Sequence, residues 1–239
     1  MSKRPPNPAW MLTAIFLAMF AAPRVDSQDA KAAQGVLVDQ VIAVVNGDLI
    51  LESDIDEERR FEAFQPFRDP GGPPSRTILI DRLIDRALIL QQAKLQADDR
   101  VTLAEAQAQL MKLRAEIPAC KPAHCETDAG WQKFVKSEGF TLPQVEELWR
   151  QRMETLRFIE IRFRAGIRIG PDEIKAYYDK TLVPELLRQK ATPPPLDNVS
   201  ERIQEILLQQ RVGSLLTDWL TTLKAQGSVR MMKPGEVAP

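Results

Sequence analysis

The chain has 239 residues, of which 44% are apolar and 27% are charged, and its formal net charge is −1. This composition is typical of a globular protein. A charge this close to zero gives no field that would attract nucleic acid or anionic lipid, so neither is expected as a partner. His124 is the single histidine, which leaves few ways to build a catalytic site that needs an imidazole.

The first residues indicate an export signal. Two basic residues precede the uncharged run 9–22, which is shorter than the roughly 20 apolar residues of a spanning helix. A basic start, a short apolar core and then small residues are typical of a secretory signal peptide. We expect residues 1–27 to be removed after Ser27, with Ala30 as the alternative site, and the mature chain to be periplasmic without stable membrane insertion. An uncleaved inner-membrane anchor is the other interpretation.

A short β-hairpin is expected to follow. Residues 38–45 are rich in β-branched side chains, and Asn46-Gly47 is a strong signal for a two-residue type I′ turn. Residues 48–51 are long enough for a brief return strand. Ser53 is then the expected N-cap of the first helix.

The rest of the chain is predicted to be almost entirely helical. Thr102 with Glu105, and Thr141 with Gln144, form capping-box patterns at two helix starts. Apolar residues recurring at spacings of three and four predict the helices that follow the first one. These helices are expected at about residues 75–97, 102–116, 127–139, 142–164, 171–190 and 199–226.

A last strand is predicted over residues 228–232, at the opposite end of the chain from the hairpin. A two-stranded hairpin is marginally stable alone, so the strand around 41–45 needs a further partner. We therefore predict a mainly α, multi-helix fold in one domain, in which a small antiparallel β element joins the amino- and carboxy-terminal strands.

The two cysteines, Cys120 and Cys125, lie close together in "ACKPAHCET". An even, closely spaced pair in an exported protein favours a disulfide that closes a small loop. Two free thiols are an alternative. A metal site that adds His124 is a further alternative, but it offers three ligands without the usual CxxC spacing, so no metal is expected.

Several segments resemble one protein family when they are taken in order. "VIAVVNGDLI" followed by Ser-Asp and a helix resembles the amino-terminal segment of SurA-type periplasmic chaperones and related parvulin-like foldases. "GFTLPQVEELWRQRMETLRFIEIRFR" and "IRIGPDEIKAYYDK" resemble the long helix and the closing helix of that module. "VGSLLTDWLTTLKAQGSVRMM" resembles the helix and strand that return to complete it. The likeness covers about residues 36–232.

The resemblance implies a domain organisation. Residues 28–190 would form the amino-terminal helical chaperone module, and residues 199–232 would supply the helix and strand that complete it. Residues 191–198 would be a proline linker in the place of the family's isomerase domain, and residues 233–239 a disordered tail. The stretch 181–198 is far shorter than the roughly 50 residues of an independent domain. We therefore expect no enzyme activity, no catalytic residue and no cofactor.

Two groups of residues could contact a partner. Phe61, Phe64 and Phe67 recur every third residue near the end of the first helix. They either pack against the second helix or form a partly exposed apolar lip for clients. The helix over 142–164 is rich in arginine, with Arg150, Arg152, Arg157, Arg162 and Arg164. Its i,i+4 pairs Glu146–Arg150 and Glu160–Arg164 favour a solvated face. Attraction of acidic client segments is the alternative.

The function that these features favour is a holdase chaperone for unfolded outer-membrane protein precursors. Such precursors alternate apolar and polar residues, and a helical surface with scattered apolar side chains suits them without ATP. One alternative is a module dedicated to a single partner, such as a subunit of the outer-membrane assembly machinery. A peptidyl-prolyl isomerase is the other alternative, and the missing domain argues against it.

Overall fold

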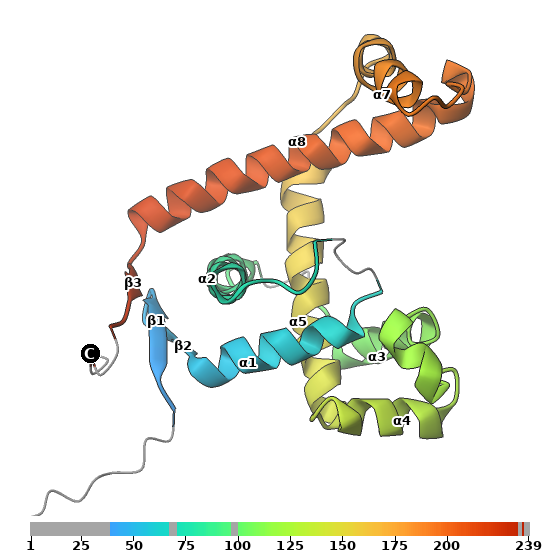
Figure 1. The fold of residues 1–239 in the computed structure, drawn as a ribbon. Coiled ribbons are helices and arrows are strands. Elements are labelled where there is room, and N and C mark those ends of the chain that lie inside the picture. Colours follow the sequence, from blue (N-terminus) through green and yellow to red (C-terminus); the bar gives the residue numbers. More distant parts are fainter. Residues whose placement is uncertain (1–38, 67–70, 97–99, 234–235, 237–239) are drawn as a thin grey trace, which may run out of the picture. The chain divides into compact units, whose positions relative to one another are not determined.

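The computed structural model of the chain is mainly helical (Figure 1) and describes residues 39–66, 71–96, 100–233 and 236. The expected signal peptide, Phe67 and most of the expected tail lie outside these residues. The described elements, in order, are β1 (Val41–Val45), β2 (Asp48–Leu51), α1 (Glu52–Phe61), the 3₁₀-helix η1 (Glu62–Phe64), α2 (Arg76–Ala93), α3 (Leu103–Leu113), the 3₁₀-helix η3 (Pro118–Ala123), α4 (Asp128–Ser137), α5 (Leu142–Ile159), the π-helix η4 (Glu160–Arg164), α6 (Pro171–Tyr177), the π-helix η5 (Tyr178–Leu182), α7 (Val183–Arg188), α8 (Leu196–Gln226) and β3 (Val229–Met231).

The strands form an antiparallel sheet in the order β2-β1-β3. The hairpin turn between β1 and β2 has φ angles of 51° at Asn46 and 95° at Gly47. Two positive φ angles are what a type I′ turn requires, so the expected turn is confirmed. β1 pairs with β3 so that Val45 faces Val229 and Ala43 faces Met231, and the predicted joining of the two terminal strands is also confirmed (Figure 1).

Asn46 extends this pairing beyond the strands. Its backbone N–H donates to the Ser228 carbonyl at 2.8 Å, and the Ser228 N–H donates to the Asn46 side-chain oxygen, also at 2.8 Å. The Asn46 amide nitrogen donates to Gln91 of α2 at 2.8 Å, and Gln91 in turn donates to the Val45 carbonyl at 2.9 Å. We call β1, β3 and these bonds of Asn46 the terminal clasp.

The helix starts follow the capping patterns, with one exception. Thr102 and Glu105 exchange their reciprocal bonds, with the Thr102 N–H donating to the Glu105 carboxylate at 2.7 Å. The Thr141 N–H donates to Gln144 at 2.8 Å. The expected N-cap role of Ser53 is wrong, because α1 already begins at Glu52 and the Ser53 hydroxyl donates to Asp39 instead.

The described helices are held by two clusters of buried apolar side chains. The first cluster joins the sheet, α1 and α2 to Phe158 of α5 and Leu220 of α8. The second joins the end of α1 to α3, η3, α4 and the first half of α5. α5 contributes Val145 and Trp149 to the second cluster and Phe158 to the first, so it connects the two.

Aromatic contacts and ion pairs hold α8 against the other helices. Trp219 contacts the rings of Phe158 and Phe163, with centroids 5.6 and 5.5 Å away. Lys224 pairs with Asp85 of α2 at 2.6 Å. Further pairs join Arg164 to Glu205 and Arg211 to Glu173.

The segment before α8 differs in detail from the expected linker. η5 and α7 continue the helical path of α6 to Arg188, and α8 already begins at Leu196. Residues 189–195 therefore join α7 to α8, and Tyr178 fixes this segment by donating its hydroxyl to the Pro194 carbonyl at 2.6 Å.

The terminal clasp gives the first testable prediction. Asn46→Gly keeps the positive φ but removes the side-chain bonds to Ser228 and Gln91. Each lost bond is worth about 0.5–1.5 kcal/mol. We therefore expect the free energy of unfolding, measured in urea, to fall by about 1–3 kcal/mol. Asn46→Asp keeps the acceptor for Ser228 and loses only the donor to Gln91, so its loss should be smaller. Equal stability of Asn46→Gly and the unchanged chain would contradict the role of the clasp.

Candidate functional site

A cleft of about 440 Å³ is the candidate functional site. It is lined by side chains from α1, η1 and the residue after it, α2, α5 and α8. A volume of this size lies within the roughly 300–1,000 Å³ that is usual for ligand pockets. We call it the central cleft.

Helical spacing explains why several elements present side chains to the central cleft. Arg82 and Arg86 are four residues apart on α2, so they lie on one face of that helix. Arg152 and Leu156 have the same spacing on α5, as do Leu216 and Leu220 on α8. Charged groups come from α1, η1, α2 and α5, whereas the two α8 residues are apolar.

The acidic residues that line the central cleft are paired. Glu58 of α1 is buried, and it accepts a bond from Arg86 at 2.7 Å. Glu62 accepts one from Arg82 at 2.6 Å. Asp85 pairs with Lys224 of α8 at 2.6 Å. These pairs join neighbouring elements around the cleft, and the bond from Arg86 offsets the cost of burying Glu58.

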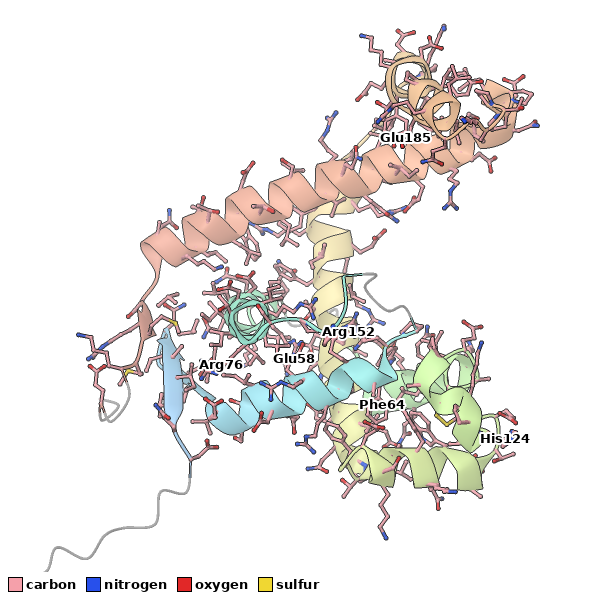
Figure 2. The ribbon with its side chains drawn as sticks, viewed as in Figure 1. Glu58, Phe64, Arg76, His124, Arg152 and Glu185 are labelled. Atoms are coloured by element: carbon pink, nitrogen blue, oxygen red, sulfur yellow. A yellow bond between two sulfur atoms is a disulfide. The ribbon has the colours of Figure 1, made fainter. Side chains whose placement is uncertain are left out.

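Arg152 differs from the other cleft arginines. In the part of the chain that the structure describes, no carboxylate lies within ion-pair distance of it, and its contact is with the Trp149 ring, 6.0 Å from the guanidinium carbon. Burial lowers the pKa of Arg152, and repulsion by Arg86 adds to this, while Glu58 opposes it. An arginine nonetheless stays charged. Figure 2 shows Arg152 and Glu58 near the centre of the helices.

The apolar part of the cleft is partly open to solvent. Ile89 and Leu220 are buried in the first cluster, and Leu216 is partly buried against it. Leu156 is 55% exposed. The cleft thus combines a cationic group with leucine side chains that a partner could cover.

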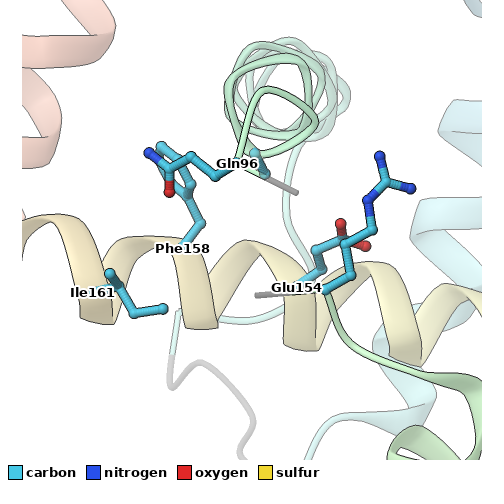
Figure 3. A pocket seen from close by; sticks show the side chains of 6 residues that line it. Gln96, Glu154, Phe158 and Ile161 are labelled. Atoms are coloured by element: carbon cyan, nitrogen blue, oxygen red, sulfur yellow. The ribbon is translucent and has the colours of Figure 1, made fainter. Parts of the chain in front are cut away.

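A second, much smaller cavity lies between the end of α2 and α5 (Figure 3). Its volume is about 10 Å³, and Gln96, Glu154 and Phe158 are among its lining residues. This is close to the space that one water molecule needs. It has no room for a peptide or a cofactor.

The phenylalanines proposed for client binding lie in the interior where they are described. Phe61 and Phe64 are buried, and the ring of Phe64 contacts those of Phe61, Phe134 and Phe140 at centroid distances of 5.1 to 5.5 Å. Their helical spacing places them between α1, α4 and α5 instead of on an open lip. Both rings are buried, as the packing interpretation expected, but in the cluster with α4 and α5 and not in the cluster that contains the second helix. Phe67 lies outside the described residues. No bound client tests a contact with these rings.

The two cysteines lie at disulfide distance. The Cα atoms of Cys120 and Cys125 are 5.7 Å apart, within the range of protein disulfides. Both residues are buried in the second cluster, and η3 packs so tightly on α4 that a Cβ at Gly130 would come within 2.2 Å of the Ala123 carbonyl oxygen.

His124, the third residue of the metal alternative, is exposed and lies beside Glu126. His124 has a left-handed backbone with φ of 58°, and its ring contacts Glu126 at 3.2 Å. Among the described residues, no group of three or more histidine, cysteine, aspartate or glutamate side chains is placed to hold a metal ion.

The arginine-rich helix is only partly a solvated face. The predicted pair Glu160–Arg164 is confirmed at 3.0 Å. The predicted pair Glu146–Arg150 is wrong, because Arg150 bonds Glu147 and Glu154 instead. The i−3 and i+4 carboxylates satisfy its guanidinium, and Glu146 accepts from Gln107 of α3.

Most residues of the central cleft carry no recognisable sequence pattern. No short motif marks Arg82, Arg86 or Glu58, and the arginine-rich pattern of α5 predicts a solvated face for Arg152, which the structure places in the cleft. The i,i+4 spacing of Arg82 and Arg86 was visible, but their partners on α1 and η1 are distant in the sequence. A cleft assembled from several helices leaves no local pattern.

Comparison with known proteins gives one informative similarity. No protein-family model matches the chain. Chaperone SurA of Alcanivorax borkumensis is 24% identical over 192 residues, which cover 74% of this chain and 43% of that protein. The chain therefore spans less than half the length of this curated relative. In the described residues, no helix is both long enough and apolar enough to cross a bilayer.

The cysteine loop gives the second prediction. Replacing both cysteines by serine should lower the free energy of unfolding by about 2 kcal/mol, since a short loop gives a small entropic effect on the unfolded chain. Urea denaturation of the two forms measures the difference. A reductant should lower the free energy of unfolding of the unchanged chain by the same amount and leave that of the double variant unaffected. A reductant effect on both forms, or on neither, would argue against the bond.

Proposed function

We propose that the chain is a holdase chaperone of the periplasm that binds unfolded outer-membrane protein precursors without ATP. The observation that carries this proposal is the similarity to chaperone SurA along 74% of the chain. The mainly helical fold and the exposed apolar rim of the central cleft are consistent with a protein that holds unfolded chains.

The physical requirement for a holdase is modest. It needs a surface that covers apolar side chains of a client and releases them again, so the surface must be apolar in part and polar in part. The central cleft has this mixed character, with Leu156 and Leu216 beside arginine and glutamate side chains. Apolar contacts give affinity in proportion to the area that they cover, without reading a sequence.

The proposal includes no catalytic step. In the family that the sequence resembles, an isomerase domain follows the helix that ends near residue 182. Here α7 and the segment 189–195 lead directly from that helix into α8. A peptide isomerisation assay checks this point, and we expect the rate with the chain present to equal the uncatalysed rate.

The test of the holdase proposal is aggregation of a barrel protein diluted from urea. The chain is expressed for export in a Gram-negative host and purified, and mass spectrometry of its amino terminus also shows whether residues 1–27 have been removed. Near-stoichiometric chain should suppress the light scattering of two unrelated outer-membrane barrels. Suppression of neither would contradict the proposal. A tight complex with one assembly-machine subunit in a pull-down would then favour the dedicated module.

A matched pair of leucines links the activity to the central cleft. Leu156 is 55% exposed at the cleft, and Leu187 is 60% exposed on α7. Leu156→Asp should raise the amount of chain needed for half suppression by about tenfold, because a leucine contact worth about 1.4 kcal/mol is replaced by a charge. Leu187→Asp should leave that amount unchanged. Equal effects of the two substitutions would show that clients do not use this cleft.

A further inference from the structure

One positive charge of the central cleft has no ion-pair partner in the part of the chain that the structure describes. Glu58, Glu62 and Asp85 are each paired with their own cation. The three acids and three arginines that line the cleft sum to zero, but Asp85 is paired with Lys224, which does not line it. Arg152 is therefore left without a carboxylate partner within the described residues. A partly buried and uncompensated charge is costly in a folded protein. The cleft is therefore complementary to a ligand with one negative charge.

A second polar group of the cleft is also unsatisfied. Gln65 follows η1 and is 7% exposed, and its side-chain oxygen is buried without a hydrogen-bond partner in the described part of the chain. Buried acceptors are nearly always bonded, so this oxygen is suited to receive an N–H from a ligand. Gln65 and Arg152 line the same cleft, although they lie far apart in the sequence.

The apolar wall of the cleft sets a third requirement for a ligand. Leu216 and Leu220 of α8 and Ile89 of α2 face the cleft. A ligand that satisfies all three features carries a carboxylate, an N–H and an apolar side chain close together. The last residue of a polypeptide carries these three groups on one Cα atom. An internal aspartate or glutamate carries its carboxylate on a polar side chain, so the same residue offers the leucines nothing to cover.

We propose that the central cleft binds the free carboxyl terminus of an unfolded polypeptide whose last side chain is apolar. Arg152 pairs with the α-carboxylate, Gln65 accepts the N–H of the terminal residue, and Leu216 and Leu220 cover its side chain. Charge-assisted bonds from arginine to carboxylate are short and strong. The inference rests on the proposed holdase function, since it names the part of the client that the cleft holds.

The test uses fluorescence anisotropy with the purified chain and three labelled peptides of the same apolar sequence. The first ends in a free carboxylate, the second in an amide, and the third in an amide with one internal glutamate. The free acid should bind at least about tenfold more tightly than either amide, because one charge-assisted bond exceeds 1.4 kcal/mol. Equal binding of the free acid and its amide would overturn the proposal. Tight binding of the glutamate peptide would overturn the assignment to the chain end.

Two arginine variants locate the effect. Arg152→Gln should lower the affinity for the free-acid peptide to that for the amide peptide, and it should leave the affinity for the amide peptide unchanged. Arg202→Gln removes an exposed arginine of α8 that does not line the cleft. This variant should keep the full difference in affinity between the free-acid and amide peptides. Because Arg152 has no ion-pair partner among the described residues, its replacement breaks no salt bridge seen there, and circular dichroism checks the fold. A difference that persists in Arg152→Gln would place the carboxylate elsewhere and contradict the assignment.

The aggregation assay distinguishes failure of the carboxylate site from failure of the holdase function. If the chain suppresses barrel aggregation but the acid and amide peptides bind equally, the holdase function stands and the carboxylate site is refuted. If the chain fails to suppress aggregation yet Arg152 still distinguishes acid from amide, the carboxylate site stands and the holdase function is refuted.

Discussion

The pairing of β1 with β3, completed by the reciprocal bonds between Asn46 and Ser228, is the interaction on which the described structure depends. β1 is the central strand and is buried along most of its length, so it needs a neighbour on each side. β3 follows α8 after Gly227 and Ser228, which means that the sheet fixes the end of that helix. Leu216 and Leu220 lie in the same end of α8. The wall of the central cleft is thus positioned by contacts at the edge of the sheet.

α5 has the complementary role. It carries core residues of both apolar clusters, and between Trp149 and Phe158 it presents Arg152 to the central cleft. Burial of Glu58 is tolerated because Arg86 bonds it, which links α1 to α2. The cleft lies beside the first cluster, which supplies Ile89, Leu216 and Leu220 to its lining, and its walls are held by packing and by paired charges. Arg152, which has no carboxylate partner within the described ranges, is an exception to the paired charges around it.

Local sequence patterns predicted the elements well and the cleft poorly, for physical reasons. The capping boxes at Thr102 and Thr141 and the Asn46-Gly47 turn depend on residues within a few positions of each other, so they could be recognised directly. The pairing of the terminal strands could be predicted because β1 needs a second neighbour and residues 228–232 were the candidate strand for it. The expected pair Glu146–Arg150 was wrong because two other carboxylates are equally close along the same helix. The burial of Phe61 and Phe64 and the pairing of Arg82 and Arg86 depend on how helices meet, which no local pattern specifies.

The sequence distance across the clasp has a consequence for how the protein folds. Asn46 and Ser228 are 182 positions apart. Bringing the ends of a flexible chain of that length together costs about 4–5 kcal/mol of entropy on the Jacobson–Stockmayer estimate, and contacts of such separation slow folding. The helices between the two strands shorten this distance if they form first. The order of events that follows is helix packing around α5, then docking of α8, and closure of the sheet as the last step, so that a newly synthesised chain completes its central cleft only after residues 229–231 have emerged.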